Sequence, residues 1–189
     1  MVVAGLEREL IEACQQGNRE AFRALFLAYQ DKVYSIALRY SGEPSLALDI
    51  SQDVFVTLFQ RIGEFRWESG FDSWLYRLVV NRSLDHQRRA RRLVPLIDEI
   101  AQRLSSPRDS LRELMRSDVA RRVQAAVGRL SPALRMVVVL RYTEGLSYDE
   151  IAEAFGCSKG TVASRLNRAH KELARRLASL HEPVVSNDD

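Results

Sequence analysis

The fold of the second half of the chain is decided by residues 146–169, which read LSYDEIAEAFGCSKGTVASRLNRA. Ser147 and Glu150 match a capping box, in which two side chains satisfy free backbone N–H groups at the start of a helix. This helix is expected to end near Gly156, because glycine readily adopts the positive φ of a tight turn. Ser158 is then suited to cap a second helix. Two helices joined by a short turn predict a helix-turn-helix.

The second helix of this motif is expected to carry one apolar and one polar face. Its apolar residues recur at spacings of three and four and are Val162, Leu166, Ala169, Leu173 and Leu177. Its outward residues are Lys159, Thr161, Ala163, Ser164, Arg165 and Arg168. In a helix-turn-helix this helix enters the major groove, where a bidentate pair from Arg to guanine discriminates by about 1–3 kcal/mol. We therefore expect Arg165 and Arg168 to provide sequence specificity.

The composition of the whole chain favours helices. Its 189 residues are 46% hydrophobic and 28% charged, with only nine glycines and five prolines, as in helix-rich domains. Apolar residues recur every three or four positions along most of the chain. We expect an all-α fold of two small helical domains joined by a flexible linker. The expected ranges are 5–92, 93–110 and 111–180, because the periodicity fades around Pro95 and around 105–107.

Short signals mark where other helices begin. Asn18 and Ser45 are expected to cap helices that follow glycine or proline breaks. Ser131 and Pro132 are expected to open another helix, since the first turn does not need the N–H that proline lacks. A loop is expected over 63–70.

Charge is distributed unevenly, although the formal net charge is only +3. Residues 77–92 hold six Arg and one acid, and residues 159–176 hold six Lys or Arg and one acid. Residues 43–72 have the opposite bias, with six acids and two Arg. We therefore expect one surface to meet DNA and another to meet a protein.

Cysteine, histidine and hydropathy patterns exclude several classes of protein. Cys14 and Cys157 lie far apart, and the three His residues fall in no ligand or nucleophile pattern. We therefore expect no disulfide, no metal site, no cofactor and no enzyme active site. No apolar run approaches the roughly 18 residues of a membrane span, and no signal peptide begins the chain. A cytoplasmic protein without membrane insertion is expected.

An aromatic stretch, FRWESGF at residues 65–71, precedes the first basic helix. Aromatic rings stack on unpaired bases at about 1–3 kcal/mol each while Arg follows the phosphates, so the pattern favours single-stranded DNA. Phe71 and Trp74 also lie on the apolar face of their helix, where they would serve as core residues. The arginine run alone would also fit a solvated helix end.

Three segments together resemble the extracytoplasmic-function sigma factors, which are promoter-recognising subunits of bacterial RNA polymerase. Residues 49–55, DISQDVF, are similar to the region-two helix that binds the clamp helices of the largest polymerase subunit. Residues 71–77, FDSWLYR, with Asn81, are similar to the promoter-melting helix. Residues 146–152, LSYDEIA, and 160–166, GTVASRL, are similar to region four.

The resemblance implies a separate site for each partner. Polymerase binding is implied for Asp49, Gln52, Asp53 and Phe55. Contacts to the opened minus-ten element are implied for Phe65, Arg66, Trp67, Phe71, Arg77, Asn81, Arg88 and Arg89. Contacts to the duplex minus-thirty-five element are implied for Ser158, Lys159, Thr161, Ser164, Arg165, Arg168 and Lys171. Ala163 stands where relatives often carry Lys or Arg, so the promoter sequence itself is not carried over.

The implied function is that of an alternative sigma factor, which directs core RNA polymerase to a specific promoter set and initiates transcription. A stress-responsive role and a separate anti-sigma factor are also implied by the family. Opening the promoter requires no covalent chemistry, because the binding of unpaired bases and phosphates offsets the cost of unstacking the bases, which is a few kcal/mol.

Other readings of the same sequence remain open. A dimeric helix-turn-helix regulator that acts without polymerase would need a receiver or ligand domain, and residues 5–92 show no alternating β/α pattern. A pure protein-binding module, such as an anti-sigma factor, does not explain the two basic segments. Taken without the rest of the chain, the helix-turn-helix pattern would also fit a helical hairpin with a solvated basic face.

Overall fold

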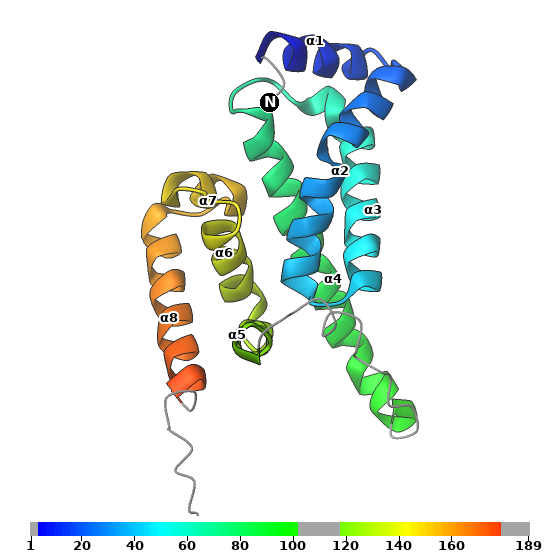
Figure 1. The fold of residues 1–189 in the computed structure, drawn as a ribbon. Coiled ribbons are helices and arrows are strands. Elements are labelled where there is room, and N and C mark those ends of the chain that lie inside the picture. The colour runs from blue at the N-terminus through cyan, green and yellow to red at the C-terminus, as the bar shows by residue number, and fades with distance from the viewer. Residues whose placement is uncertain (1–3, 102–117, 179–189) are drawn as a thin grey trace, which may run out of the picture.

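The computed structural model describes residues 4–101 and 118–178, in which every regular element is a helix (Figure 1). The N-terminal unit comprises α1 (Ala4–Gln15), α2 (Arg19–Ser41), α3 (Pro44–Arg61), the short 3-10 helix η1 (Ile62–Glu64) and α4 (Phe71–Ala101). The C-terminal unit comprises α5 (Asp118–Gly128), α6 (Pro132–Tyr142), α7 (Tyr148–Phe155) and α8 (Lys159–Leu177). The all-α prediction is confirmed.

Two of the predicted helix starts agree with the structure. The Asn18 side chain accepts hydrogen bonds from the backbone N–H groups of Glu20 at 3.0 Å and Ala21 at 3.1 Å, so it caps α2. Helix α6 begins behind Ser131 with Pro132 in its first turn, although the Ser131 side chain makes no capping hydrogen bond. These starts follow from local chemistry, which the sequence alone contains.

The predicted cap of α3 is wrong by two residues. The N-cap is Glu43, and Pro44 occupies the first turn. Ser45 lies inside the helix, where its hydroxyl donates to the Glu43 carboxylate at 2.7 Å. The missing N–H of Pro44 is not needed in the first turn, so the proline opens the helix instead of preceding it.

Helix α4 continues beyond its predicted end. It runs through Pro95 to Ala101, so residues 93–101 of the expected linker are helical. A proline inside a helix costs about 3 kcal/mol, which is why its presence predicts an end. Ala, Arg and Leu surround Pro95 and favour helix. The rest of the expected linker, residues 102–110, lies outside the described residues.

Buried apolar residues of both units form one continuous core. The large, fully buried side chains of the N-terminal unit are Ile11, Leu25, Val33, Ile36, Tyr40, Ile50, Leu58 and Leu75. Those of the C-terminal unit are Met136, Leu140, Ile151 and Leu166. Complete burial of one such aliphatic side chain stabilises a fold by about 1.5–3 kcal/mol. This core therefore fixes the helices that present the polar residues.

The two units lie against each other, with α7 packed on α4 and α6 packed on α2. Arg135 of α6 donates to the backbone carbonyl of Tyr40 at 3.0 Å, and its guanidinium carbon lies 5.5 Å from the centre of the Tyr40 ring. Arg77 of α4 faces Glu153 of α7 at 3.9 Å. Among the described helices, none combines the length and the apolar character that a membrane span requires.

Candidate functional site

The helix-turn-helix forms as the sequence predicts. The Ser147 hydroxyl accepts from the N–H of Glu150 at 3.2 Å, and the Glu150 carboxylate accepts from the N–H of Ser147 at 2.7 Å. Hydrogen bonding to the side chain and backbone of Ser147 lowers the pKa of Glu150. Gly156 ends α7 with φ 61°, and the Ser158 hydroxyl accepts from the N–H of Thr161 at 3.2 Å to cap α8.

Most of the predicted duplex contacts are exposed on α8. The exposed ones are Ser158, Lys159, Ser164, Arg168 and Lys171. Thr161 is half-buried and its hydroxyl lies 2.9 Å from that of Ser158. Lys159 pairs with Asp149 of α7 at 2.8 Å, and this pair is open to solvent. The exposed α8 residues can contact DNA without disturbing the core.

Arg165 differs from the other predicted duplex contacts. Its guanidinium carbon lies 5.0 Å from the centre of the Phe155 ring, and one of its nitrogens lies 3.8 Å from the sulfur of Cys157. The side chain is half-buried against the turn between α7 and α8. Of the two arginines expected to give specificity, Arg168 is the exposed one.

Asn167 is a candidate contact that the sequence reasoning missed. It is exposed and lies three residues after Ser164 and four before Lys171, on the same face of α8. An Asn side chain can pair with adenine through two hydrogen bonds. Its spacing of three residues from Ser164 already places it on the outward face of the helix.

A second polar face runs along α4. Arg77, Asn81, Arg88 and Arg89 are all exposed there, at spacings that keep them on one side of a helix. We call these four residues the α4 stripe. Arg88 also lies 3.1 Å from Asp85, and this surface pair leaves the arginine exposed. The α4 stripe therefore offers three cations and an amide to a phosphate chain.

The loop before α4 contains the predicted aromatic stretch, but two of its rings are not available to DNA. Phe65 is 5% exposed and Phe71 is 2% exposed. Their ring centres lie 5.6 Å apart, edge to face. Phe71 therefore serves as a core residue, as its place on the apolar face of its helix indicated, and Phe65 is buried beside it. A direct contact of either ring with the opened minus-ten element stays a prediction that this burial does not support. Arg66 is exposed and Trp67 is half-buried, so these two remain accessible.

The predicted polymerase contacts lie on α3, and one of them, Asp53, borders the α4 stripe at Arg89. Asp49 and Gln52 are exposed on α3, whereas Phe55 is 7% exposed. The ring of Phe55 meets Phe26 of α2 edge to face at 4.7 Å. Phe55 therefore contributes to this face as the floor of a groove and not as a projecting side chain.

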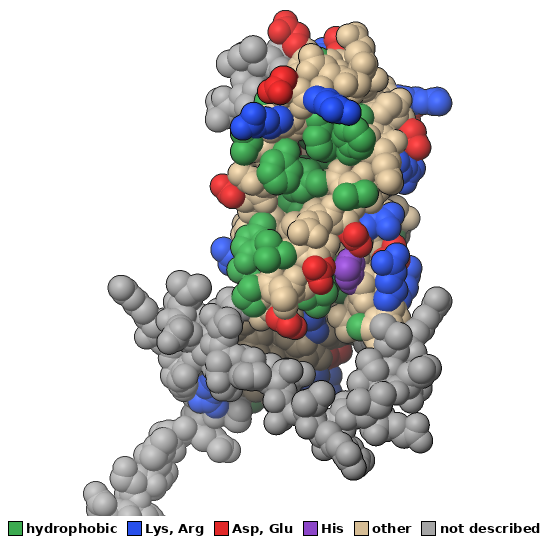
Figure 2. Space-filling view, turned by 90° about the vertical axis from the view of Figure 1, so that its right-hand side faces the viewer, with side chains coloured by type: hydrophobic (Ala, Val, Ile, Leu, Met, Phe, Trp, Pro, Cys, Tyr) green, Lys and Arg blue, Asp and Glu red, His purple; other side chains and the backbone are tan. Residues whose placement is uncertain are grey.

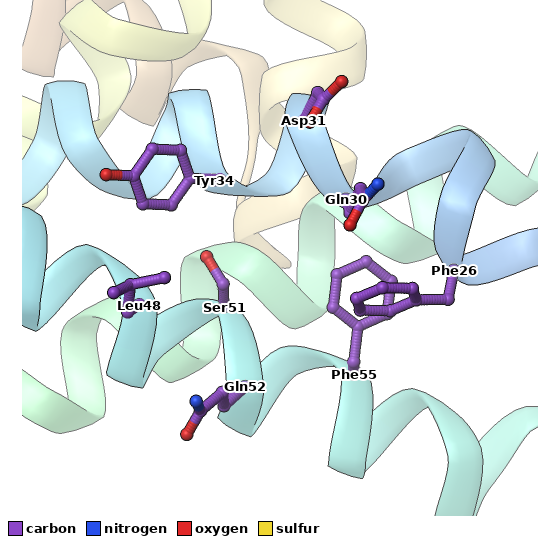
Figure 3. A pocket seen from close by; sticks show the side chains of 8 residues that line it. All are labelled: Phe26, Gln30, Asp31, Tyr34, Leu48, Ser51, Gln52 and Phe55. Carbon is purple, nitrogen blue, oxygen red and sulfur yellow. The ribbon is translucent and has the colours of Figure 1, made fainter. Parts of the chain in front are cut away.

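A shallow groove of about 300 Å³ lies on the surface where α2 packs against α3 (Figure 3). It lies at the lower end of the roughly 300–1,000 Å³ that small-molecule pockets span. Figure 2 shows apolar side chains gathered over the α3 side of the molecule, with charged side chains around them. The groove is lined by Phe26, Gln30, Asp31, Tyr34, Leu48, Ser51, Gln52 and Phe55.

Exposed apolar residues beside this groove were missed by the sequence reasoning. Leu48, Val56 and Phe59 of α3 are 52%, 54% and 57% exposed. A helical pattern assigns such residues to the core, because it does not reveal which side of a helix lacks a neighbour. Contiguous exposed apolar side chains indicate a protein interface.

Asp53 is the fourth predicted polymerase contact, and its side chain is engaged within the unit. Its carboxylate lies 2.8 Å from the Nε2 atom of His86 and 3.9 Å from Arg89, both on α4. The carboxylate remains 42% exposed. Asp53 thus joins α3 to α4, and the sequence reasoning gave His86 no role.

Comparison with known proteins identifies the family. The sigma-70 region 2 family matches residues 25–93 and the sigma-70 region 4 family matches residues 120–173. The RNA polymerase sigma-H factor of Pseudomonas aeruginosa is 31% identical over 189 residues, which cover 95% of this chain and 98% of that protein. The ECF RNA polymerase sigma-E factor of Escherichia coli K12 is 32% identical over 187 residues, covering 92% and 95%. The chain belongs to the ECF sigma factors.

Solved sigma factor structures share the fold of this ECF sigma factor. The sigma factor RpoE of Bartonella quintana, solved with the anti-sigma factor NepR, has a TM-score of 0.65 and 24% identity, covering 83% of this chain and 96% of that one. CnrH, solved with the cytosolic domain of CnrY, has a TM-score of 0.63 and 23% identity, covering 91% and 97%. Because both sequence identities are below 25%, these two similarities show a shared fold and nothing further.

Membership of the family establishes the general function. This ECF sigma factor is a transcription initiation factor and not an enzyme, and its partners are core RNA polymerase and promoter DNA. Region 2 corresponds to α2, α3, η1 and the first part of α4, and region 4 corresponds to α5 to α8.

Proposed function

We propose that this ECF sigma factor divides promoter recognition between its two units and binds polymerase through a third surface. The observation that carries this proposal is the separation of its surfaces. Exposed basic residues occupy α4 and α8, whereas apolar and acidic residues surround the groove between α2 and α3. Residues 5–92, 93–110 and 111–180 remain the proposed domains and linker, with the helical extension of α4 reaching into the linker.

The C-terminal unit is proposed to read the minus-thirty-five element as duplex DNA. Arg168 and Asn167 would contact base edges, since both are exposed on the outward face of α8. Phosphate contacts are assigned to Ser158, Lys159, Ser164 and Lys171, with Thr161 supporting the helix start. Arg165 would reach DNA after leaving its contact with Phe155.

The N-terminal unit is proposed to hold the opened minus-ten element. Arg66 and Trp67 of the loop would receive an unpaired base, because they are its accessible members. The α4 stripe would then follow the phosphates of the same strand. Phe65 and Phe71 would act indirectly by shaping the loop from below.

The face between α2 and α3 is proposed to bind core polymerase. Asp49 and Gln52 would form its polar rim, and Phe55 would lie beneath the groove that Phe26 and Leu48 border. Interfaces commonly combine an apolar centre with such a rim. The groove is small enough to suit a side chain of a partner helix.

We extend three further expectations from the family to this chain. The first is control by a separate anti-sigma factor, by analogy with the Bartonella quintana sigma factor RpoE, which was solved with the anti-sigma factor NepR. The second is a stress-responsive role, by analogy with the sigma-E and sigma-H relatives. The third is a cytoplasmic location, since bacterial polymerase and the chromosome lie there.

Run-off transcription with bacterial core polymerase tests the proposal. The purified protein is mixed with core enzyme and a library of randomised promoters, and core enzyme alone is the control. Start-specific transcripts that share two spaced elements are expected, and they supply the preferred promoter. Sequence-specific binding by the protein alone, without affinity for core enzyme, would favour a dimeric regulator instead.

A further inference from the structure

Helix α1 holds the loop between α3 and α4 from outside the core. Figure 1 shows α1 at the same end of the N-terminal unit as the connection from α3 to α4. The side-chain amide of Gln15 donates to the backbone carbonyls of Ile62 at 3.0 Å and Phe65 at 2.8 Å. An amide nitrogen has two N–H donors, so both are used on the loop.

A second contact joins α1 to the loop at Trp67. The guanidinium carbon of Arg8 lies 5.3 Å from the centre of the indole ring, a favourable cation–π arrangement. Trp67 has a φ of 59°, in the left-handed region that bulky residues rarely occupy. A backbone in this region persists only when its surroundings hold it. The loop conformation therefore depends on contacts such as those from α1.

Helix α1 is itself anchored to the rest of the unit. The Glu7 carboxylate accepts a hydrogen bond from the Tyr29 hydroxyl of α2 at 2.9 Å, and Ile11 is fully buried. These contacts do not involve the amide of Gln15. A change at Gln15 can therefore loosen the loop while leaving α1 in place.

We propose that Gln15 and Arg8 are positioning residues for minus-ten recognition. They hold Arg66 and Trp67 in the conformation that receives an unpaired base. A segment that is ordered before binding loses less conformational entropy on binding, so the hydrogen bonds of Gln15 add to the affinity for the captured base. This inference rests on the proposed role of the loop.

The sharpest variant is Gln15→Glu, because an ionised carboxylate has the same shape as the amide and no N–H to donate. Gln16→Glu is the matched control. Gln16 is exposed at the same end of α1, so its substitution adds the same charge near the same helix terminus without touching the loop.

The test uses full-length protein with core polymerase and the promoter selected by the unaltered protein. Transcription is measured from the selected promoter and from templates with one base changed in the minus-ten or the minus-thirty-five element. In Gln15→Glu, preference for the selected minus-ten base should fall by about fivefold or more, since two lost hydrogen bonds are worth at least about 1 kcal/mol. The base preference of Gln15→Glu at the minus-thirty-five element should equal that of Gln16→Glu. Partial unfolding would instead lower transcription from all templates by one common factor.

Hydrogen exchange of the free protein gives a second readout that needs no DNA. Amides of residues 62–70 should exchange faster in Gln15→Glu than in Gln16→Glu. An unchanged minus-ten preference overturns the inference, whether or not exchange is faster. If the unaltered protein gives no start-specific transcripts, the proposed function itself fails, and faster exchange would still demonstrate that Gln15 orders the loop.

Discussion

The two arginines of α8 that were expected to read bases lie in different surroundings. Arg168 is exposed, whereas Arg165 lies against Phe155 and Cys157. Their order in the sequence predicts that both point away from the apolar face. It does not predict that an aromatic ring of the preceding helix is close enough to hold one of them.

We predict that Arg168→Ala weakens use of the selected promoter by about 1–3 kcal/mol and relaxes base preference in the minus-thirty-five element. The reason is the loss of an exposed guanidinium at the face that meets the groove. Run-off transcription from promoter variants measures both effects. Arg175→Ala is the control, because Arg175 is exposed near the other end of α8. If Arg168→Ala leaves the base preference unchanged, Arg168 does not contribute to base recognition.

We also predict that Leu48→Glu weakens binding to core polymerase by about 1 kcal/mol or more, as for a residue at the centre of an interface. Leu48 lines the groove and is 52% exposed, so the substitution should leave the fold intact. Leu27 is 56% exposed on α2 and does not line the groove, which makes Leu27→Glu the matched control. Titration of labelled core enzyme measures both affinities. Equal affinities would argue against the groove as the docking site.

At the scale of helices, boundaries set by neighbouring residues were the most predictable features, although the cap of α3 was misplaced by two residues. The capping box and the turn at Gly156 were predicted correctly because they depend on neighbouring residues alone. The continuation of α4 through Pro95 depends on the balance between one costly residue and its helix-forming neighbours. The burial of Phe71 follows from its place on the apolar face of its helix. The burial of Phe65 and the bond from Asp53 to His86 depend instead on tertiary contacts, which sequence periodicity does not reveal.

The capping box makes the C-terminal unit sensitive to Ser147. We predict that Ser147→Ala lowers its free energy of unfolding by about 1 kcal/mol, the usual cost of losing an N-cap. Urea unfolding followed by circular dichroism measures the change. Ser164→Ala is the control, because that serine is exposed within α8 and caps no helix. A loss no larger than that of the control would contradict the role of the cap.

The same box has a pH dependence whose sign follows from Glu150. Its pKa is lowered by hydrogen bonding to Ser147, so the folded state favours the ionised carboxylate. This contribution to stability is present above the ordinary pKa of glutamate and is lost as the pH falls through the lowered one. In Glu150→Gln the amide oxygen can still accept the Ser147 N–H. On acidification, the variant should therefore lose less free energy of unfolding than the unaltered protein. Unfolding curves of both proteins at neutral and acidic pH measure this difference. An equal loss in both proteins would contradict this.

At the scale of the whole molecule, Arg135 is the stronger of two polar contacts that add to the apolar packing between the units, the other being the pair of Arg77 and Glu153. That pair is 3.9 Å apart with both side chains accessible, and exposed pairs contribute only about 0–1 kcal/mol. Arg135 is half-buried and donates to the carbonyls of Tyr40, Gly128 and Leu130. It therefore links α2 to the turn before α6.

We predict that Arg135→Leu separates the units in solution without unfolding them. Small-angle scattering should give a larger radius of gyration than that of the unaltered protein, and one above the roughly 16 Å of a compact chain of this length. Circular dichroism should show the same helix content. Arg129→Leu is a control at an exposed position beside the same turn. A radius equal to that of the unaltered protein would show that other contacts hold the units together.

Arg77 lies where the two units meet and also belongs to the α4 stripe. In the structure it faces Glu153, whereas the proposed function places it on the opened strand. When only some molecules are in the competent arrangement, the apparent dissociation constant equals the intrinsic constant divided by the competent fraction. If the opened strand binds only molecules whose units are apart, the contact between the units would lower the apparent affinity for every promoter. At a given cellular concentration, the stability of that contact would then decide whether only the strongest promoters or also the weaker ones are filled.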